Sequence, residues 1–209
     1  MPLTSFERFL FILPIVSHGP QMSHGLSGPS PYTIYCIPQF SAKPPHYVGS
    51  LRPYPLLESA VVDWDLIEHP STMTLNKYLR LGLNRLLVEQ ATTLPLPAIS
   101  IISIYLPWTI NVRARNGAYV TPEDIFDAVY LSLRTNITAN EFNSLPHLED
   151  QKRAARAYRQ RYSRFLGICA YNEEKRGGMK RIDFLMGRTT FHSISNTGRR
   201  SDEWWLNVS

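Results

Sequence analysis

The sequence has little cysteine and no metal-binding spacing. Its 209 residues include two cysteines, Cys36 and Cys169, and neither has a second cysteine or a histidine at the distance that zinc sites use. No two of its six histidines stand four residues apart around a glutamate, so the helical zinc-hydrolase arrangement is absent. The small number of cysteines and the spacing of the cysteines and histidines argue against a disulfide framework and against a zinc centre. No cofactor is predicted.

Recognisable catalytic motifs are also missing from the sequence. It has no nucleophile elbow, no phosphate-cradling glycine loop and no dinucleotide fingerprint. Asp63 and Asp65 share one side of an extended segment, but no third ligand follows nearby, and aspartates in a turn are the plainer interpretation. Convergence of His192, Asp183 and one of these aspartates in a closed hollow would instead indicate a catalyst. No catalytic residue is predicted, and an enzyme of undetected class stays open.

The sequence contains no hydrophobic run long enough to cross a bilayer. The apolar stretch 9–16 is too short for that purpose. It follows Glu7 and Arg8 and leads to no small-residue cleavage site, which are not the features of a secretory signal. We therefore predict a protein of the cytoplasm or nucleus with no membrane span.

Proline is abundant and unevenly distributed along the chain. Most of the 16 prolines lie in the first 55 residues, among glycine, serine and tyrosine. Such a composition sustains neither a helix nor a sheet ladder. It predicts a largely disordered extension over 1–55 and a single folded domain over 56–209. The extension is interpreted as a linker, with an extended ligand for a partner domain as the alternative.

Hydrophobic periodicity outlines the fold of the second part. Strict alternation of apolar and polar residues predicts a strand at 108–115, and shorter apolar runs predict strands at 99–106, 180–186 and 203–208. The hydroxyl of Thr121, followed by Pro122 and two acids, predicts the start of a helix over 122–134. We expect an α+β fold in which an antiparallel sheet is covered on one face by this helix and a second helix over 147–166.

The second helix carries the strongest concentration of positive charge. Its apolar face includes Ala154 and Tyr158, and Gly167 is expected to end it before a charged loop at 173–178. The rest of its circumference is basic and is expected to face solvent: Lys152, Arg153, Arg156, Arg159, Arg161 and Arg164. These cations suit phosphates, but no aromatic residue stands between them for base stacking, so an ordinary surface helix is the alternative.

Two further pairs of residues invite a structural prediction. Asp183 and Arg181, on the predicted strand 180–186, are interpreted as a structural ion pair, with orientation of a ligand as the alternative. Trp204 and Trp205 point to opposite sides of the last strand, so one is expected in the core and the other on an exposed patch. The candidate interaction surface therefore comprises Lys152, Arg156, Arg159 and Trp205.

Several blocks of residues follow one another in a fixed order along the chain: Asp63-Trp64-Asp65-Leu66, Ala91-Thr92 with Pro95, Pro107-Trp108-Thr109-Ile110-Asn111-Val112, Val120-Thr121-Pro122-Glu123-Asp124-Ile125, Arg181-Ile182-Asp183-Phe184-Leu185 with Phe191, and Trp205. Their order resembles a domain of unknown function that is common in proteins of mushroom-forming fungi, the basidiomycetes. The similarity extends over about 56–209, and Pro122 and the pair Ser193-Ile194 depart from the family's usual residues. The resemblance implies a fungal origin and one fold unit, and it brings no activity and no catalytic residues.

The sequence as a whole favours a non-enzymatic protein-interaction module that recruits a protein partner through an exposed sheet face or edge. The net charge of +5 and the pI near 9.3 permit contact with nucleic acid or anionic lipid headgroups without requiring it. A nucleic-acid-binding domain that uses the basic helix around 152–164 is the alternative function.

Overall fold

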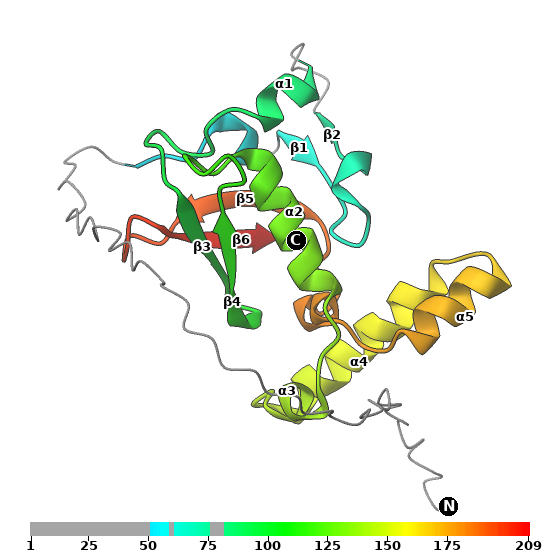
Figure 1. The fold of residues 1–209 in the computed structure, drawn as a ribbon. Helices are drawn as coiled ribbons and strands as arrows, with labels where there is room; N and C mark the ends of the chain where they lie inside the picture. The colour runs from blue at the N-terminus through cyan, green and yellow to red at the C-terminus, as the bar shows by residue number, and fades with distance from the viewer. Residues whose placement is uncertain (1–50, 59–60, 76–81) are drawn as a thin grey trace, which may run out of the picture. The chain divides into compact units, whose positions relative to one another are not determined.

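A computed structural model describes residues 51–58, 61–75 and 82–209, and its main body is a four-stranded sheet with helices beside it (Figure 1). The strands are β3 (Ala98–Ser103), β4 (Leu106–Arg113), β5 (Phe191–Asn196) and β6 (Glu203–Val208), in the spatial order β4-β3-β6-β5. A second, two-stranded antiparallel sheet joins β1 (Val62–Asp63) to β2 (Thr74–Leu75). The predicted α+β class is confirmed. Most of the predicted extension, residues 1–50, lies outside the described residues.

The large sheet is made of two hairpins placed side by side. The pairs β3–β4 and β5–β6 are antiparallel, whereas β3 and β6 run parallel and place Ile101 opposite Trp204. The prediction of an antiparallel sheet is therefore wrong for this central pair. Each hairpin follows from local alternation, but nothing local in the sequence indicates which strand of one hairpin joins the other.

The first long helix begins as its sequence signals predict. Helix α2 covers Pro122–Arg134 and lies against β4. The Thr121 hydroxyl accepts a hydrogen bond from the Asp124 backbone amide, and the Asp124 carboxylate accepts one in return from the Thr121 amide. This reciprocal cap satisfies two donors that the first helical turn leaves free. The predicted bounds of 122–134 are confirmed.

The predicted strand at 180–186 is wrong, because this segment forms the 3-10 helix η3 (Arg181–Leu185). The four residues Ile182–Leu185 are all buried, so buried and exposed positions do not alternate in this segment. Without such alternation, the sequence does not distinguish a helical turn from a strand that is buried on both faces. The Asp183 carboxylate accepts a hydrogen bond from the Lys180 backbone amide at 2.8 Å, which caps the turn. The third strand of the sheet is β5 instead.

The second long helix ends earlier than predicted and does not cover the sheet. Helix α4 spans Leu148–Ser163 and packs against η3 and against α5 (Ile168–Arg176), which together with α4 forms a helical hairpin. The predicted loop at 173–178 is therefore largely helical, and Gly167 is the N-cap of α5. Two short helices, α1 (Leu83–Leu87) and α3 (Ala139–Asn143), complete the described elements, with the 3-10 turns η1 (Pro55–Leu57) and η2 (Pro70–Thr72).

The hydrophobic core joins segments that are distant in sequence. Trp64, Phe126 and Phe191 form an aromatic triangle with ring centroids 5.4 to 5.9 Å apart, and none is more than 2% exposed. The triangle connects the segment after β1 to α2 and to β5. Leu56 and Leu57 are buried in the same core. In the described part of the chain, no helix is long and apolar enough to cross a membrane.

Candidate interaction surfaces

The predicted basic residues of α4 divide between solvent and the interior. Lys152, Arg156 and Arg159 are exposed, as predicted. The Lys152 ammonium lies 3.7 Å from the Glu149 carboxylate, and Arg159 donates a long hydrogen bond of 3.4 Å to the Ala155 carbonyl. Exposed contacts of this kind contribute little to stability and leave the cations available to a partner.

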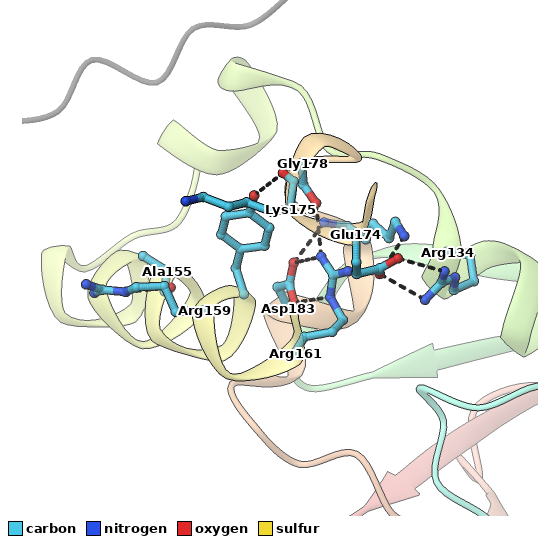
Figure 2. Close-up of polar contacts among 10 residues, drawn as sticks. Arg134, Ala155, Arg159, Arg161, Glu174, Lys175, Gly178 and Asp183 are labelled. Carbon is cyan, nitrogen blue, oxygen red and sulfur yellow. Dashed lines mark hydrogen bonds and ion pairs between the residues drawn. The ribbon is translucent and has the colours of Figure 1, made fainter. Parts of the chain in front are cut away.

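Arg161 is buried, and its predicted exposure is wrong. Its side chain binds the Asp183 carboxylate through two parallel hydrogen bonds, Nε to Oδ1 at 2.9 Å and Nη2 to Oδ2 at 2.8 Å. Nη2 also donates to the Gly178 carbonyl at 3.0 Å, and Nη1 donates to the Glu174 carboxylate. Figure 2 shows Arg161 turned toward these partners and Arg159 turned away from them. A two-pronged pairing of this geometry is specific to arginine.

Arg161 and the charges around it come from four helical segments and a loop. Glu174 of α5 accepts a hydrogen bond from the Lys180 ammonium at 2.7 Å and lies 3.2 Å from Arg134 of α2. Together these side chains hold α4, α5, η3 and α2 to one another (Figure 2). We refer to the five residues as the buried ion cluster: Arg134, Arg161, Glu174, Lys180 and Asp183.

Three members of the buried ion cluster have displaced pKa values. Burial raises the pKa of Glu174, but the hydrogen bond from Lys180 and the positive charges of Lys180, Arg134 and Arg161 lower it by more, so it lies below 4.5. Burial lowers the pKa of Lys180, and the hydrogen bond to Glu174 only partly opposes that effect. Burial also lowers the pKa of Arg161, but its hydrogen bond and ion pair with Asp183 raise it by more. Glu174 and Arg161 are therefore charged at neutral pH.

The lowered pKa of Glu174 predicts a loss of stability in acid. Because the folded-state pKa lies below the unfolded value, the stabilisation is complete above about pH 4.5 and is lost as the pH falls through the folded-state pKa. The urea midpoint of the wild type should therefore fall between about pH 5 and pH 3. Glu174→Gln should fall less steeply over this range, whereas Glu173→Gln, at an exposed position, should keep the wild-type slope. Equal slopes for all three proteins would contradict the role given to Glu174.

The predicted ion pair between Asp183 and Arg181 is wrong. The Asp183 carboxylate forms its ion pair with Arg161. The Arg181 guanidinium instead lies 3.5 Å from the Glu141 carboxylate. The Arg181 guanidinium stacks on the Trp108 ring of β4, with 4.5 Å between its Cζ and the ring centroid. The 3-10 turn explains the difference, because its side chains do not share the face that a strand would give residues two apart.

An aromatic ladder closes the hairpin of α4 and α5. Tyr162 packs edge to face against Tyr158, at 5.0 Å between centroids, and against Tyr171, at 5.2 Å. The Tyr158 hydroxyl donates to the Lys175 carbonyl at 2.6 Å, and the Lys175 ammonium lies 5.8 Å from the rings of Tyr162 and Tyr171. These contacts add to the buried ion cluster and make the hairpin one packed unit.

The polar residues named as a possible catalytic group have separate surroundings. Asp65 accepts hydrogen bonds from the Ile67 amide at 3.0 Å and from Arg164 at 2.5 Å, whereas Asp183 binds Arg161. Asp63 and His192 are exposed. Across 51–58, 61–75 and 82–209, no three histidine, cysteine or acidic side chains gather as metal ligands would.

Trp204 and Trp205 lie on opposite faces of β6, as predicted. Trp204 is 1% exposed and belongs to the core, whereas Trp205 is half-buried on the other face, between Ile102 of β3 and Ser195 of β5. Trp205 borders a shallow depression of about 330 Å³. We call this depression the Trp205 surface, and its lining residues are Ile104, Tyr105, Trp205, Leu206, Asn207 and Val208.

The Trp205 surface combines apolar side chains with oriented polar groups. Ile104 is 76% exposed, and the Arg188 guanidinium covers one side of Tyr105 at 4.6 Å from the ring centroid. The Asn207 amide nitrogen donates to the hydroxyls of Ser193 and Ser195, both at 3.0 Å. A large exposed aliphatic residue beside a half-buried tryptophan is typical of a surface that binds another molecule.

Comparison with known proteins identifies a family but no activity. The profile of a family of unknown function, DUF6699, matches residues 62–202. The chain belongs to this family. No curated protein and no solved structure matches it. The DUF6699 match includes the buried ion cluster and the hairpin of α4 and α5 but ends one residue before β6, which carries Trp205.

Proposed function

We propose that this DUF6699 protein is a non-enzymatic interaction module that recruits a protein partner through the Trp205 surface. The observation that supports the proposal is the exposure of Ile104 beside a half-buried tryptophan at an open depression of the sheet. A partner side chain that covers this depression would remove apolar area from water on both molecules. Tryptophan is among the residues that most often dominate the binding energy of such contacts.

The arrangement of the polar residues favours binding over catalysis. Arg161 and Asp183, each 2% exposed, are paired with each other in the buried ion cluster, where they hold helices together. The Trp205 surface supplies the Asn207 side chain as a polar contact, which suits orientation of a partner more than proton transfer. An enzyme of undetected class remains the alternative that a substrate-bound structure would establish.

Nucleic-acid binding is the second candidate function, and it rests on the exposed cations of α4. Arg156 and Arg159 occupy the solvent side of this helix with no buried partner among the described residues. Phosphate contacts would give affinity that falls linearly on a log scale with salt. If this function is correct, Arg156→Glu with Arg159→Glu abolishes binding of a DNA duplex; unchanged binding by that variant excludes it.

The proposal also covers the domain boundaries of the protein, its location in the cell and its origin. Residues 1–55 are proposed as an extension and residues 56–209 as the single folded domain. Leu56 and Leu57 are buried in the core, and the end of the proposed extension contacts the domain, since the Tyr54 amide donates to the Ala91 carbonyl. We place the protein in the cytoplasm or nucleus, where the exposed free thiol of Cys169 would stay reduced. A fungal, basidiomycete origin stays a prediction from the resemblance.

Quantitative affinity capture tests the Trp205 surface. The full chain, Trp205→Ala and Leu131→Ala are each used as bait in a lysate of cells that express the protein. Leu131 is a matched control because it is 64% exposed and belongs to α2 rather than to the open sheet face. We expect at least one captured protein to be lost from Trp205→Ala and retained by Leu131→Ala. Identical captured sets from all three baits would refute the proposal.

A further inference from the structure

The turn between α4 and α5 exposes an apolar tip. Leu166 is 101% exposed and Ile168 is 80% exposed, and the half-buried Phe165 precedes them. The hairpin extends away from the sheet, and this turn is its outer end (Figure 1). Exposure of two neighbouring aliphatic side chains to water is unfavourable in free energy, and contact with another molecule would remove that apolar area from water.

The same hairpin carries nearly all of the chain's excess positive charge. Residues 148–176 contain eight lysines and arginines against four acids, a net charge of +4 within a chain of +5. Three exposed cations, Lys152, Arg156 and Arg159, follow one another at four- and three-residue intervals, which places them on one side of α4. This basic stripe runs along a helix that is about 24 Å long and leads toward the apolar tip.

The hairpin is held firmly enough to present both features together. Its inner side is joined to the rest of the fold by Arg161 in the buried ion cluster and by the ion pair of Arg164 with Asp65. The aromatic ladder closes the two helices on each other. The tip and the basic stripe are therefore held at fixed positions on one packed unit, and we call these residues together the hairpin surface: Lys152, Arg156, Arg159, Leu166 and Ile168.

We infer that the hairpin surface binds the face of an anionic lipid bilayer. Leu166 and Ile168 enter the boundary between headgroups and acyl chains, and the cations of α4 contact lipid phosphates and carboxylates. This pairing of aliphatic insertion with basic attraction is the general mode of peripheral membrane binding.

Charge and shape favour a lipid surface over the other occupants. A nucleic acid would use the cations but would gain nothing from two exposed aliphatic side chains. A second copy of the chain at the tip would bring two hairpins of net charge +4 together, which repel each other. A bilayer satisfies both features, because it offers negative charge beside an apolar layer that accepts a protruding tip.

Cosedimentation of the full chain with lipid vesicles tests the inference. Vesicles contain phosphatidylcholine alone or with about 30% phosphatidylserine, which supplies the anionic surface. We expect the wild type to bind only the anionic vesicles. Arg156→Gln with Arg159→Gln should weaken this binding about 25-fold, since each cation near such a surface contributes about fivefold. Leu166→Ser with Ile168→Ser should weaken it by about tenfold.

Matched double variants separate the hairpin surface from general properties of the chain. Arg85→Gln with Arg113→Gln removes the same charge at exposed positions of α1 and β4. Val88→Ser with Leu131→Ser removes two exposed aliphatic residues away from the hairpin, at 56% and 64% exposure. Both controls should bind vesicles within about twofold of the wild type.

Four results would overturn the inference. The first is no binding to anionic vesicles, and the second is binding that neither hairpin variant weakens, which would place the contact elsewhere. The third is binding that only the arginine variant weakens, because the tip would then play no part. The fourth is that a different molecule occupies the hairpin surface. This would be shown by dimers that form without vesicles and that Leu166→Ser with Ile168→Ser abolishes, or by binding of a DNA duplex in place of vesicles.

Discussion

Replacing Arg161 with methionine is expected to lower the free energy of unfolding by about 3–5 kcal/mol. Methionine keeps much of the side-chain length but removes every hydrogen bond that Arg161 makes to Asp183, Glu174 and the Gly178 carbonyl. Asp183 is 2% exposed, so its carboxylate would lose its guanidinium partner in a site that water barely reaches. Removing one partner of a buried ion pair leaves the other charge buried without a partner. This loss of stability is far larger than the effect of replacing both partners with apolar residues of the same shape.

Arg159→Met is the matched control for this prediction. The two arginines are two positions apart in α4, but Arg159 is exposed, and the one hydrogen bond of its side chain within the described part of the chain is the long contact with the Ala155 carbonyl. Its replacement should change the free energy of unfolding by less than about 0.5 kcal/mol. Urea unfolding followed by circular dichroism measures both variants. Similar losses for the two proteins would show that the buried ion cluster does not hold the helices together.

Trp204→Ala is expected to cost about 3–5 kcal/mol, the range for removal of a large aromatic side chain from a core. Trp204 of β6 is 1% exposed. Its register partner on the neighbouring strand β3 is Ile101, which is 0% exposed. The cavity would therefore open at the parallel pair that joins the two hairpins of the sheet. Within 51–58, 61–75 and 82–209, β3 and β6 are the strand pair that links these hairpins, so the cavity would weaken their main connection.

Trp205→Ala provides the contrast on the same strand. Its side chain is half-buried on the open face, so its removal should cost about 1 kcal/mol. Thermal unfolding by scanning calorimetry and urea unfolding should agree on the order of the two variants. A loss from Trp205→Ala that equals the loss from Trp204→Ala would mean that the Trp205 surface is part of the core rather than a binding surface.

The elements that the sequence predicts well are those whose signals are local. Helix α2 has its cap at Thr121, its proline at the first position and an apolar stripe, and each signal lies within the helix itself. The alternation of β4 is equally local, and so is the opposition of Trp204 and Trp205 on β6. In these segments the chain's own periodicity determines both the element and the face that it buries.

The errors arise where distant segments decide the outcome. The run Ile182–Leu185 is buried on all sides because α2, α4 and β4 surround it, and burial without periodicity does not distinguish a strand from a 3-10 turn. Arg161 appears as one of six cations on a basic helix, and its burial depends on Asp183, which is 22 residues away. Only a spatial neighbour separates Arg161 from Arg159, so the buried ion cluster could not be predicted from spacing alone.

The candidate surfaces were only partly predictable for the same reason. Lys152, Arg156, Arg159 and Trp205 follow from helix and strand periodicity, and all four lie where that reasoning places them. Ile104 falls within the predicted strand 99–106, and Leu166 falls on the apolar face of the predicted helix 147–166, but both predictions are wrong, because each residue lies in the turn that follows β3 or α4 and is exposed. Their exposure depends on whether a neighbouring segment folds back over the turn, which periodicity does not reveal.

Site-specific photo-crosslinking tests the central claim most directly. The full chain carries p-benzoylphenylalanine at position 205 or, as the control, at position 131, and is irradiated in cells that express it. The account predicts a crosslinked adduct of defined mass from position 205 and none from position 131, because the partner covers the Trp205 surface and leaves the exposed side of α2 free. Absence of an adduct at 205, or the same adducts from both positions, would contradict it.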